Sequence, residues 1–171
     1  MKKTILITIG SLFVCIAISF YAFDFSGKDS VEVEESNGPK GGKIIEIDEV
    51  RTKTIEEEFP MNLSEISVQD AIHGMSHQKI RAKDKWGFIP LTAERVERLT
   101  AVVESNINVY KHANVYYDIL SRWSKNDFSM VDEDHNAIWE MQNGNIGKAT
   151  GILSVEQERE FIEKHFEIVN Q

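Results

Sequence analysis

The sequence predicts a mainly all-α protein, a compact bundle of about five short helices with at most a minor β-hairpin, behind an N-terminal transmembrane helix and a flexible linker. Two observations lead to this prediction. Apolar residues in the region 59–171 recur at intervals of three and four, the period of an amphipathic helix. An uncharged apolar stretch long enough to cross a bilayer comes near the start of the chain. We therefore divide the chain into residues 1–23, 24–58 and 59–171.

Residues 4–23 form the predicted membrane anchor. This stretch holds no charged side chain and follows Lys2 and Lys3. Twenty helical residues span about 30 Å, the thickness of the hydrocarbon core. Bulky aromatic residues follow the small residues around Ser19, which favours an uncleaved anchor over a cleaved secretory signal. The positive-inside tendency then places residues 24–171 outside the cytoplasm. Secretion after cleavage of the signal is the alternative.

Residues 24–58 are predicted to be an acidic flexible linker. They hold 11 acidic and 5 basic residues, and glycine, proline and serine interrupt them several times. Such a composition is typical of segments that bury too little apolar surface to fold. Within the linker, residues 43–50 fit either a short strand or an arm packed on the domain, and the sequence leaves both open.

Five helices are predicted in residues 59–171, the extracytoplasmic domain. The expected starts lie near Asn62, at residues 90–92, near Ala113, after Ser129 and after Ser154. Ser154 and Gln157 have the spacing of a capping box. The short connections between the helices indicate one compact domain. Residues 85–89 and 149–153 are expected to pair as the minor β-hairpin.

Composition and motifs exclude several classes of function. Acidic residues outnumber basic ones by 28 to 19, which gives a net charge of −9. A chain this acidic is a poor candidate for binding a phosphate backbone, so no nucleic-acid partner is expected. The single cysteine, Cys15, falls inside the predicted anchor, and no Gly-x-Ser-x-Gly elbow occurs. The sequence therefore contains no signature of nucleophilic catalysis.

The sharpest chemical pattern is the Asp-x-x-His-x-x-x-His spacing of Asp70, His73 and His77. Steps of three and four place these residues on one face of a helix, opposite the stripe of Val68 and Met75. Two imidazoles one turn apart, with a carboxylate nearby, can hold zinc when water or a remote residue completes the site. A solvated or hydrogen-bonded polar face is the favoured interpretation. A zinc site, with hydrolysis as its chemistry, is the alternative.

The favoured function is that of an interaction module presented outside the cell. This hypothesis rests on the predicted anchor, on the linker and on the lack of a catalytic signature. We expect the partner to be an envelope protein or a wall polymer. Lys79, Arg81, Lys83 and Lys85 are the one basic concentration on an acidic domain. An extended backbone would place all four cations on one face, whereas a helix would spread them around the surface.

Several motifs occur together in residues 59–166. They are Phe-Pro-Met-Asn at 59–62, Ile-His-Gly-Met-Ser-His-Gln-Lys at 72–79, Lys-Trp-Gly-Phe at 85–88, Ile-Leu-Ser-Arg-Trp at 119–123, Asp-His-Asn-Ala-Ile-Trp at 134–139 and Ile-Gly-Lys-Ala-Thr-Gly at 146–151. With this set the chain resembles a family of small exported or membrane-anchored proteins of Bacillus and its relatives, classed as a domain of unknown function. The resemblance implies a Gram-positive envelope location and transfers no catalytic residue. It raises the question of whether Asp70, His73, His77 and His135 converge in space.

Overall fold

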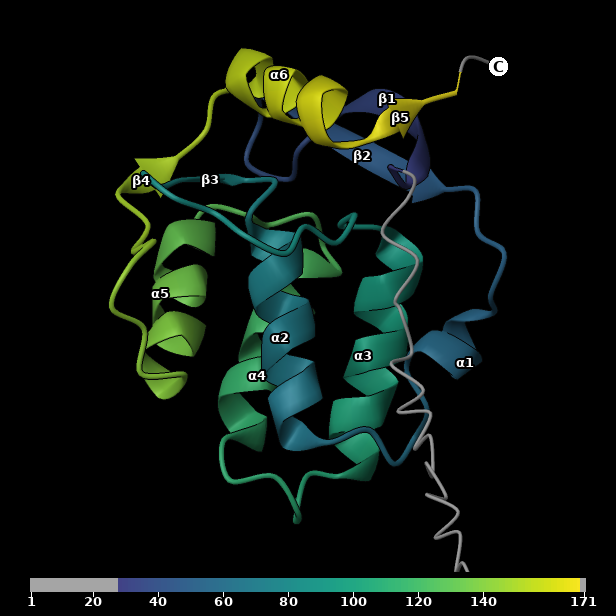
Figure 1. Cartoon of the computed structure of the whole chain (residues 1–171), viewed down its shortest axis with the longest axis vertical. Coiled ribbons are helices and arrows are strands. Elements are labelled where there is room, and N and C mark those ends of the chain that lie inside the picture. Colours follow the sequence, from purple (N-terminus) through teal and green to yellow (C-terminus); the bar gives the residue numbers. More distant parts are fainter. Residues whose placement is uncertain (1–27, 170–171) are drawn as a thin grey trace, which may run out of the picture.

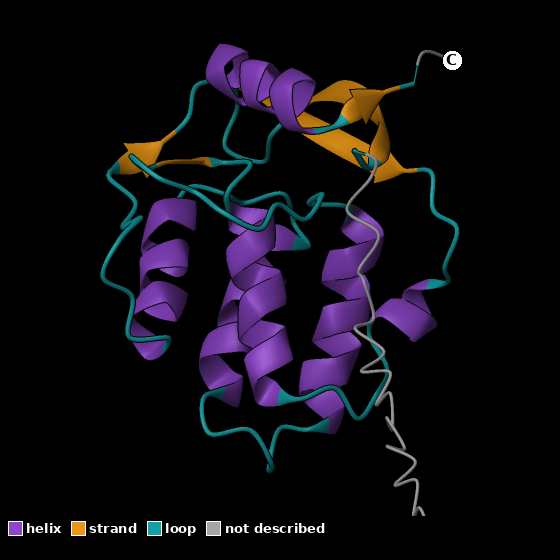
Figure 2. Ribbon diagram, viewed as in Figure 1, coloured by secondary structure: helices purple, strands orange, loops and turns teal. Residues whose placement is uncertain are grey.

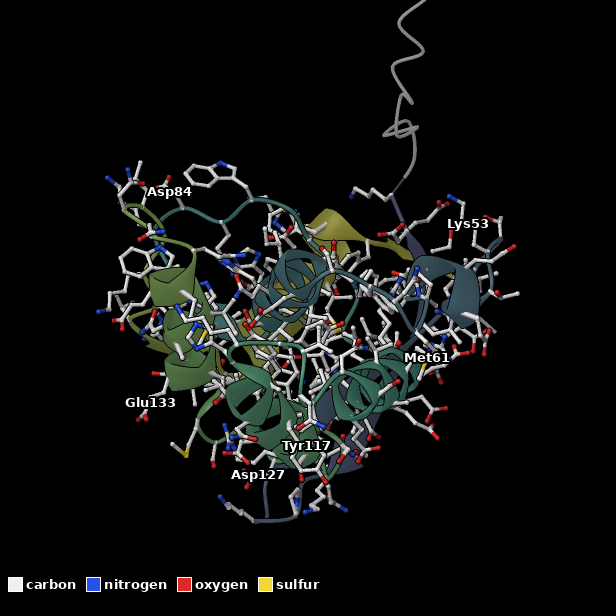
Figure 3. All side chains as sticks on the ribbon, turned by 90° about the horizontal axis from the view of Figure 1, so that it is seen from below. Lys53, Met61, Asp84, Tyr117, Asp127 and Glu133 are labelled. Carbon is white, nitrogen blue, oxygen red and sulfur yellow. The ribbon has the colours of Figure 1, made fainter. Side chains whose placement is uncertain are left out.

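The computed structural model describes residues 28–169, which form two layers (Figure 1). One layer consists of helices, and the other consists of a helix laid over a three-stranded sheet (Figure 2). In chain order the elements are β1 Ser30–Asn37, β2 Lys43–Glu49, α1 Ile55–Glu58, α2 Glu65–Ser76, β3 Ile80–Arg81, α3 Ala93–Ser105, α4 Ala113–Trp123, α5 Val131–Met141, β4 Gly151–Ile152, α6 Val155–His165 and β5 Glu167–Ile168. Seen from below, α2 lies in the middle of the helical layer, with Glu133 and Lys53 toward opposite edges (Figure 3).

The prediction of a mainly all-α fold is wrong. Residues 28–169 contain five strands in two sheets beside the helices, so the fold is mixed α/β. The larger sheet has the order β2-β1-β5, with β1 antiparallel to β2 and parallel to β5. Helix α6 packs on one face of this sheet, and the helical layer lies on its other side (Figure 1).

The predicted flexible linker is also wrong from Ser30 onward, because this segment forms β1, β2 and α1. Apolar and acidic residues alternate along the two strands, and in the antiparallel register Val33 lies opposite Ile47. The alternation gives the hairpin one apolar face, which is buried under α6. Gly41 and Gly42 adopt positive φ angles in the turn between the strands. Glycines that suggested flexibility therefore build a tight turn.

The predicted membrane anchor, residues 4–23, lies outside the described residues. Within residues 28–169, no helix is both long enough and apolar enough to cross a membrane. The anchor, and the extracytoplasmic location that follows from it, stay predictions.

The five predicted helices are present as α2 to α6. The capping box that begins at Ser154 is confirmed at the start of α6. Helix α2 begins later than expected, because Ser64 rather than Asn62 provides the capping side chain. Ser129 does not cap α5; its backbone N–H and its hydroxyl instead donate to Asp127. These differences are shifts of helix ends and leave the packed faces unchanged.

The minor hairpin differs from its prediction in one strand. Strand β4 lies in the predicted segment, but its antiparallel partner is β3 rather than residues 85–89. Residues 85–89 instead cross α2 closely at Gly74, where the Ile89 N–H donates to the Gly74 carbonyl. An added Cβ at Gly74 would lie 3.0 Å from the Gly87 carbonyl oxygen. The missing side chain at Gly74 therefore lets this loop reach the helix.

Two hydrophobic cores meet at a buried ion pair. The first core lies among α1 to α5, and the second lies between α6 and the sheet. Lys79, at the end of α2, places its Nζ 2.6 Å from Glu158 Oε1 on α6 and donates to the Ile45 carbonyl of β2. Gln78 Nε2 donates to the same Glu158 oxygen. Both charged side chains are about 95% buried, so the pair connects the two layers away from water.

Breaking this pair is expected to destabilise the fold strongly. Glu158→Ala leaves the Lys79 ammonium buried without its counter-charge, which should lower the free energy of unfolding by about 3–5 kcal/mol in urea titrations. The double variant Lys79→Met/Glu158→Leu removes both charges, so its free energy of unfolding should fall much less. Arg159→Ala on the same helix is the control, because its ion pair with Glu35 is exposed and worth at most about 1 kcal/mol. Equal losses in the single and double variants would contradict the prediction.

Candidate metal centre

Three histidines from two helices converge in the helical layer. His73 and His77 lie on or at the end of α2, and His135 lies on α5. The ring centroid of His73 is 4.8 Å from that of His77 and 4.5 Å from that of His135, and His77 and His135 are 5.4 Å apart. One ligand nitrogen of each ring lies within 4.8 Å of the other two. The structure therefore brings His135 to the predicted histidine pair.

The cluster follows from how α2 and α5 bury their apolar faces. Val68, Ile72 and Met75 on α2 and Val131 and Ile138 on α5 are fully buried in the first core. Packing these faces together places the flanking imidazoles between the two helices. His77 is 3% exposed and His135 is 0% exposed, whereas His73 is half-buried. The polar face of α2 is therefore covered by α5 here rather than solvated.

The Nδ1 atom of every ring faces an oxygen. His73 Nδ1 lies 2.5 Å from Gln142 Oε1, and His77 Nδ1 lies 3.2 Å from the Gly87 carbonyl oxygen. His135 Nδ1 lies 3.3 Å from Asn136 Oδ1. A carbonyl oxygen can only accept, so each ring carries a proton on Nδ1, and the lone pair of a neutral ring is then on Nε2.

Further hydrogen bonds fix which end of each amide faces the histidines. Gln142 Nε2 donates to Asp70 Oδ1 at 2.8 Å, which leaves its oxygen toward His73. Asn136 Nδ2 donates to the Ala149 carbonyl, and Asn136 Oδ1 accepts from the Ala149 N–H. Reversing Gln142 would place its oxygen against the Asp70 carboxylate, and reversing Asn136 would place its NH2 group against the Ala149 N–H. The tautomer of the rings is therefore set by their surroundings.

The Nε2 atom of His135 has no hydrogen-bond partner although it is buried. A buried nitrogen without a partner costs about 1–3 kcal/mol. Tetrahedral zinc with Zn–N bonds of about 2.0–2.1 Å places its ligand nitrogens about 3.4 Å apart. The observed limit of 4.8 Å is wider than this, and inward rotation of the rings would close the difference. Residue types and tautomers fit a zinc ion, to which the ligand nitrogens would have to move closer.

Asp70 lies outside the group of ligand atoms. Its carboxylate is exposed and contacts the site only through Gln142, in a chain from Asp70 to Gln142 to His73. Such outer contacts orient a ligating imidazole. Gln142, Asn136 and the Gly87 carbonyl were not among the site residues expected from the sequence. Asn136 was recognisable only as the neighbour of a histidine, and no sequence pattern marks Gln142 or Gly87.

Burial keeps two of the three rings neutral. Burial first, and then the nearby rings of His73 and His135, lower the pKa of His77 to about 3. Burial and the His73 ring lower the pKa of His135 to about 4. Both rings are therefore uncharged at neutral pH, which is the form that binds a metal.

The four alternating cations do not form one basic face. Lys79 is buried in its pair with Glu158, and Lys85 donates from Nζ to the carbonyls of His77 and Ile80. Arg81 and Lys83 are exposed. Strand β3 covers only Ile80–Arg81, so the four side chains do not lie on one strand.

The metal-free protein is expected to lose stability as the pH falls from about 6.5 to about 4. In this range the unfolded histidines take up protons, while His77 and His135 in the fold do not. Each contributes a slope of up to about 1.4 kcal/mol per pH unit. Urea unfolding at pH 7, 6 and 5 with a chelator present measures this slope. His77→Gln should reduce it and His112→Gln, outside the cluster, should not. An unchanged slope in His77→Gln would contradict the assignment.

Comparison with known proteins finds one family. A family of unknown function, DUF6241, matches residues 72–163. No curated protein and no solved structure matches the chain. The matched range holds all three histidines of the cluster and extends from α2 into α6. Because it makes up more than half of the sequence, the chain belongs to the family of unknown function DUF6241.

Proposed function

We propose that this domain binds a zinc ion through His73, His77 and His135. The observation that carries the proposal is the arrangement of the rings: each Nδ1 lies against an oxygen, which leaves Nε2 as the ring atom that can bind a metal. Metal-ligating histidines are held in this way by outer-shell acceptors. The buried, unpaired Nε2 of His135 would gain a partner in the metal.

The ligand types indicate which metals fit. Three neutral imidazoles suit zinc and other late first-row metals, whereas calcium and magnesium require oxygen ligands. Zinc accepts a set of three protein ligands and a fourth non-protein ligand. The alternative expected from the sequence is a zinc site on Asp70, His73 and His77 that water or a remote residue completes. In the proposed site His135 takes the place of that remote residue. The interaction module, its anchor at residues 4–23 and its envelope or wall-polymer partner stay predictions.

Zinc binding is tested on the full-length chain, purified in a mild detergent and stripped with a chelator. Isothermal titration calorimetry and metal analysis should give one zinc per chain. Zinc at a hundredfold excess over its Kd stabilises the fold by about 2.7 kcal/mol, which should raise the Tm by about 5–10 °C in a domain of this size.

Matched variants locate the site. His73→Ala/His77→Ala and His135→Leu should each abolish stoichiometric binding, and His112→Ala, which changes a histidine outside the cluster, should bind as the parent does. Circular dichroism shows whether each variant is folded. His135→Leu retains a side chain of similar size, so folding and metal binding can be separated. Stoichiometric binding by the folded double variant would overturn the proposal.

The contact between Gln142 and His73 is expected to tune the affinity. Gln142→Leu removes the acceptor of His73 Nδ1 and the link to Asp70, so the zinc Kd should rise about 10- to 100-fold while the stoichiometry stays at one. Glu140→Gln in the last turn of α5, next to Gln142, is the control, because Glu140 is exposed and pairs with Lys148. An unchanged Kd in Gln142→Leu would show that this contact does not orient the ligand.

A further inference from the structure

The histidine cluster supplies only three of the four ligands that zinc prefers. Among the described residues, no carboxylate or thiolate belongs to the group of ligand atoms. The Asp70 carboxylate contacts the cluster through Gln142. Asp134, which precedes His135 on α5, forms an ion pair with Arg122 and accepts a hydrogen bond from the Trp123 indole N–H. The fourth position is therefore not assigned to either of these side chains.

Among residues 28–169, no negatively charged ligand atom belongs to the group formed by the three rings. The imidazoles are neutral donors, so a bound divalent ion would keep its full charge in a largely buried site, which is unfavourable. The Lys85 ammonium adds a positive charge, since its Nζ donates to the His77 carbonyl at 2.9 Å. Burial is the main cause of the low pKa of His77 and His135, and the charge of Lys85 adds to it.

The site is closed on one side and reaches the surface on the other. His77 and His135 are buried, whereas His73 and Gln142 are half-buried and Asp70 is exposed. The outer edge of the cluster is therefore the side formed by His73 and Gln142. This edge is the partly exposed part of the cluster.

We propose that the fourth position of the zinc site takes a compact, exchangeable anion, held by the metal and favoured by the charge of Lys85. This inference rests on the proposed zinc site. The ligand class is a small inorganic anion or carboxylate, because such a group supplies both the missing donor atom and the missing negative charge. Lys85 acts through its charge alone, since its ammonium is already bonded to the His77 and Ile80 carbonyls. Three protein ligands and one exchangeable position are the arrangement of reactive rather than structural zinc sites.

The test replaces zinc by cobalt(II), whose visible spectrum reports its ligands. Cobalt(II) is titrated into the stripped full-length chain, and azide is then added to the loaded protein. The expected result is one cobalt per chain and a visible spectrum that changes with azide and saturates. A spectrum that does not respond to azide or to acetate would overturn the anion proposal and leave the metal site standing. Failure to bind cobalt and zinc at all would overturn both.

Two lysine variants test the charge. Lys85→Gln removes the ammonium and should raise the Kd for azide by a factor on the order of ten. Lys83→Gln, an exposed neighbour in the same segment, should leave that Kd unchanged. One bound cobalt per chain shows that each variant retains the site. An azide Kd that is the same in Lys85→Gln and in the parent would overturn the role given to Lys85.

Discussion

The buried pair of Lys79 and Glu158 is the interaction on which the arrangement of the two layers depends. Each layer has its own hydrophobic core, and hydrophobic burial does not specify direction. The ion pair does specify how the layers are oriented, because a charge buried without its partner is costly and the two side chains must therefore meet. Lys79 also binds the Ile45 carbonyl, so the position of α6 and that of the sheet are set from one side chain.

The same short stretch of chain serves the candidate metal centre. His77, Gln78 and Lys79 are consecutive: the first turns toward α5, and the other two turn toward α6. Gly74, one turn earlier, lets the loop at Gly87 come close enough for its carbonyl to accept from His77. Residues that join the layers and residues that hold the histidines are therefore positioned by the end of one helix. A metal ion would add a cross-link between α2 and α5 at this point.

The histidine cluster has the character of a site rather than of a packed core. Apolar side chains at this place would bury no polar atoms. The three imidazoles do bury polar atoms, and the Nε2 of His135 remains without a hydrogen-bond partner. Such a cost is often found where function requires it. The surrounding oxygens fix the tautomer of all three rings, so a metal would meet nitrogens that are already correctly protonated. Preorganisation of this kind lowers the cost of binding.

The sequence by itself determined the helices of the folded region, the capping box at Ser154 and the common face of His73 and His77, because helical periodicity and capping are local properties. It misjudged β1, where acidic composition masked an alternation of apolar residues, and it left residues 43–50 open between a strand and a packed arm, of which the structure forms the strand β2. Only the tertiary structure decided that His135 joins the pair and that Gln142 and Gly87 orient it. These contacts link residues up to 69 positions apart, and no local pattern encodes which distant side chains meet when two apolar faces are buried.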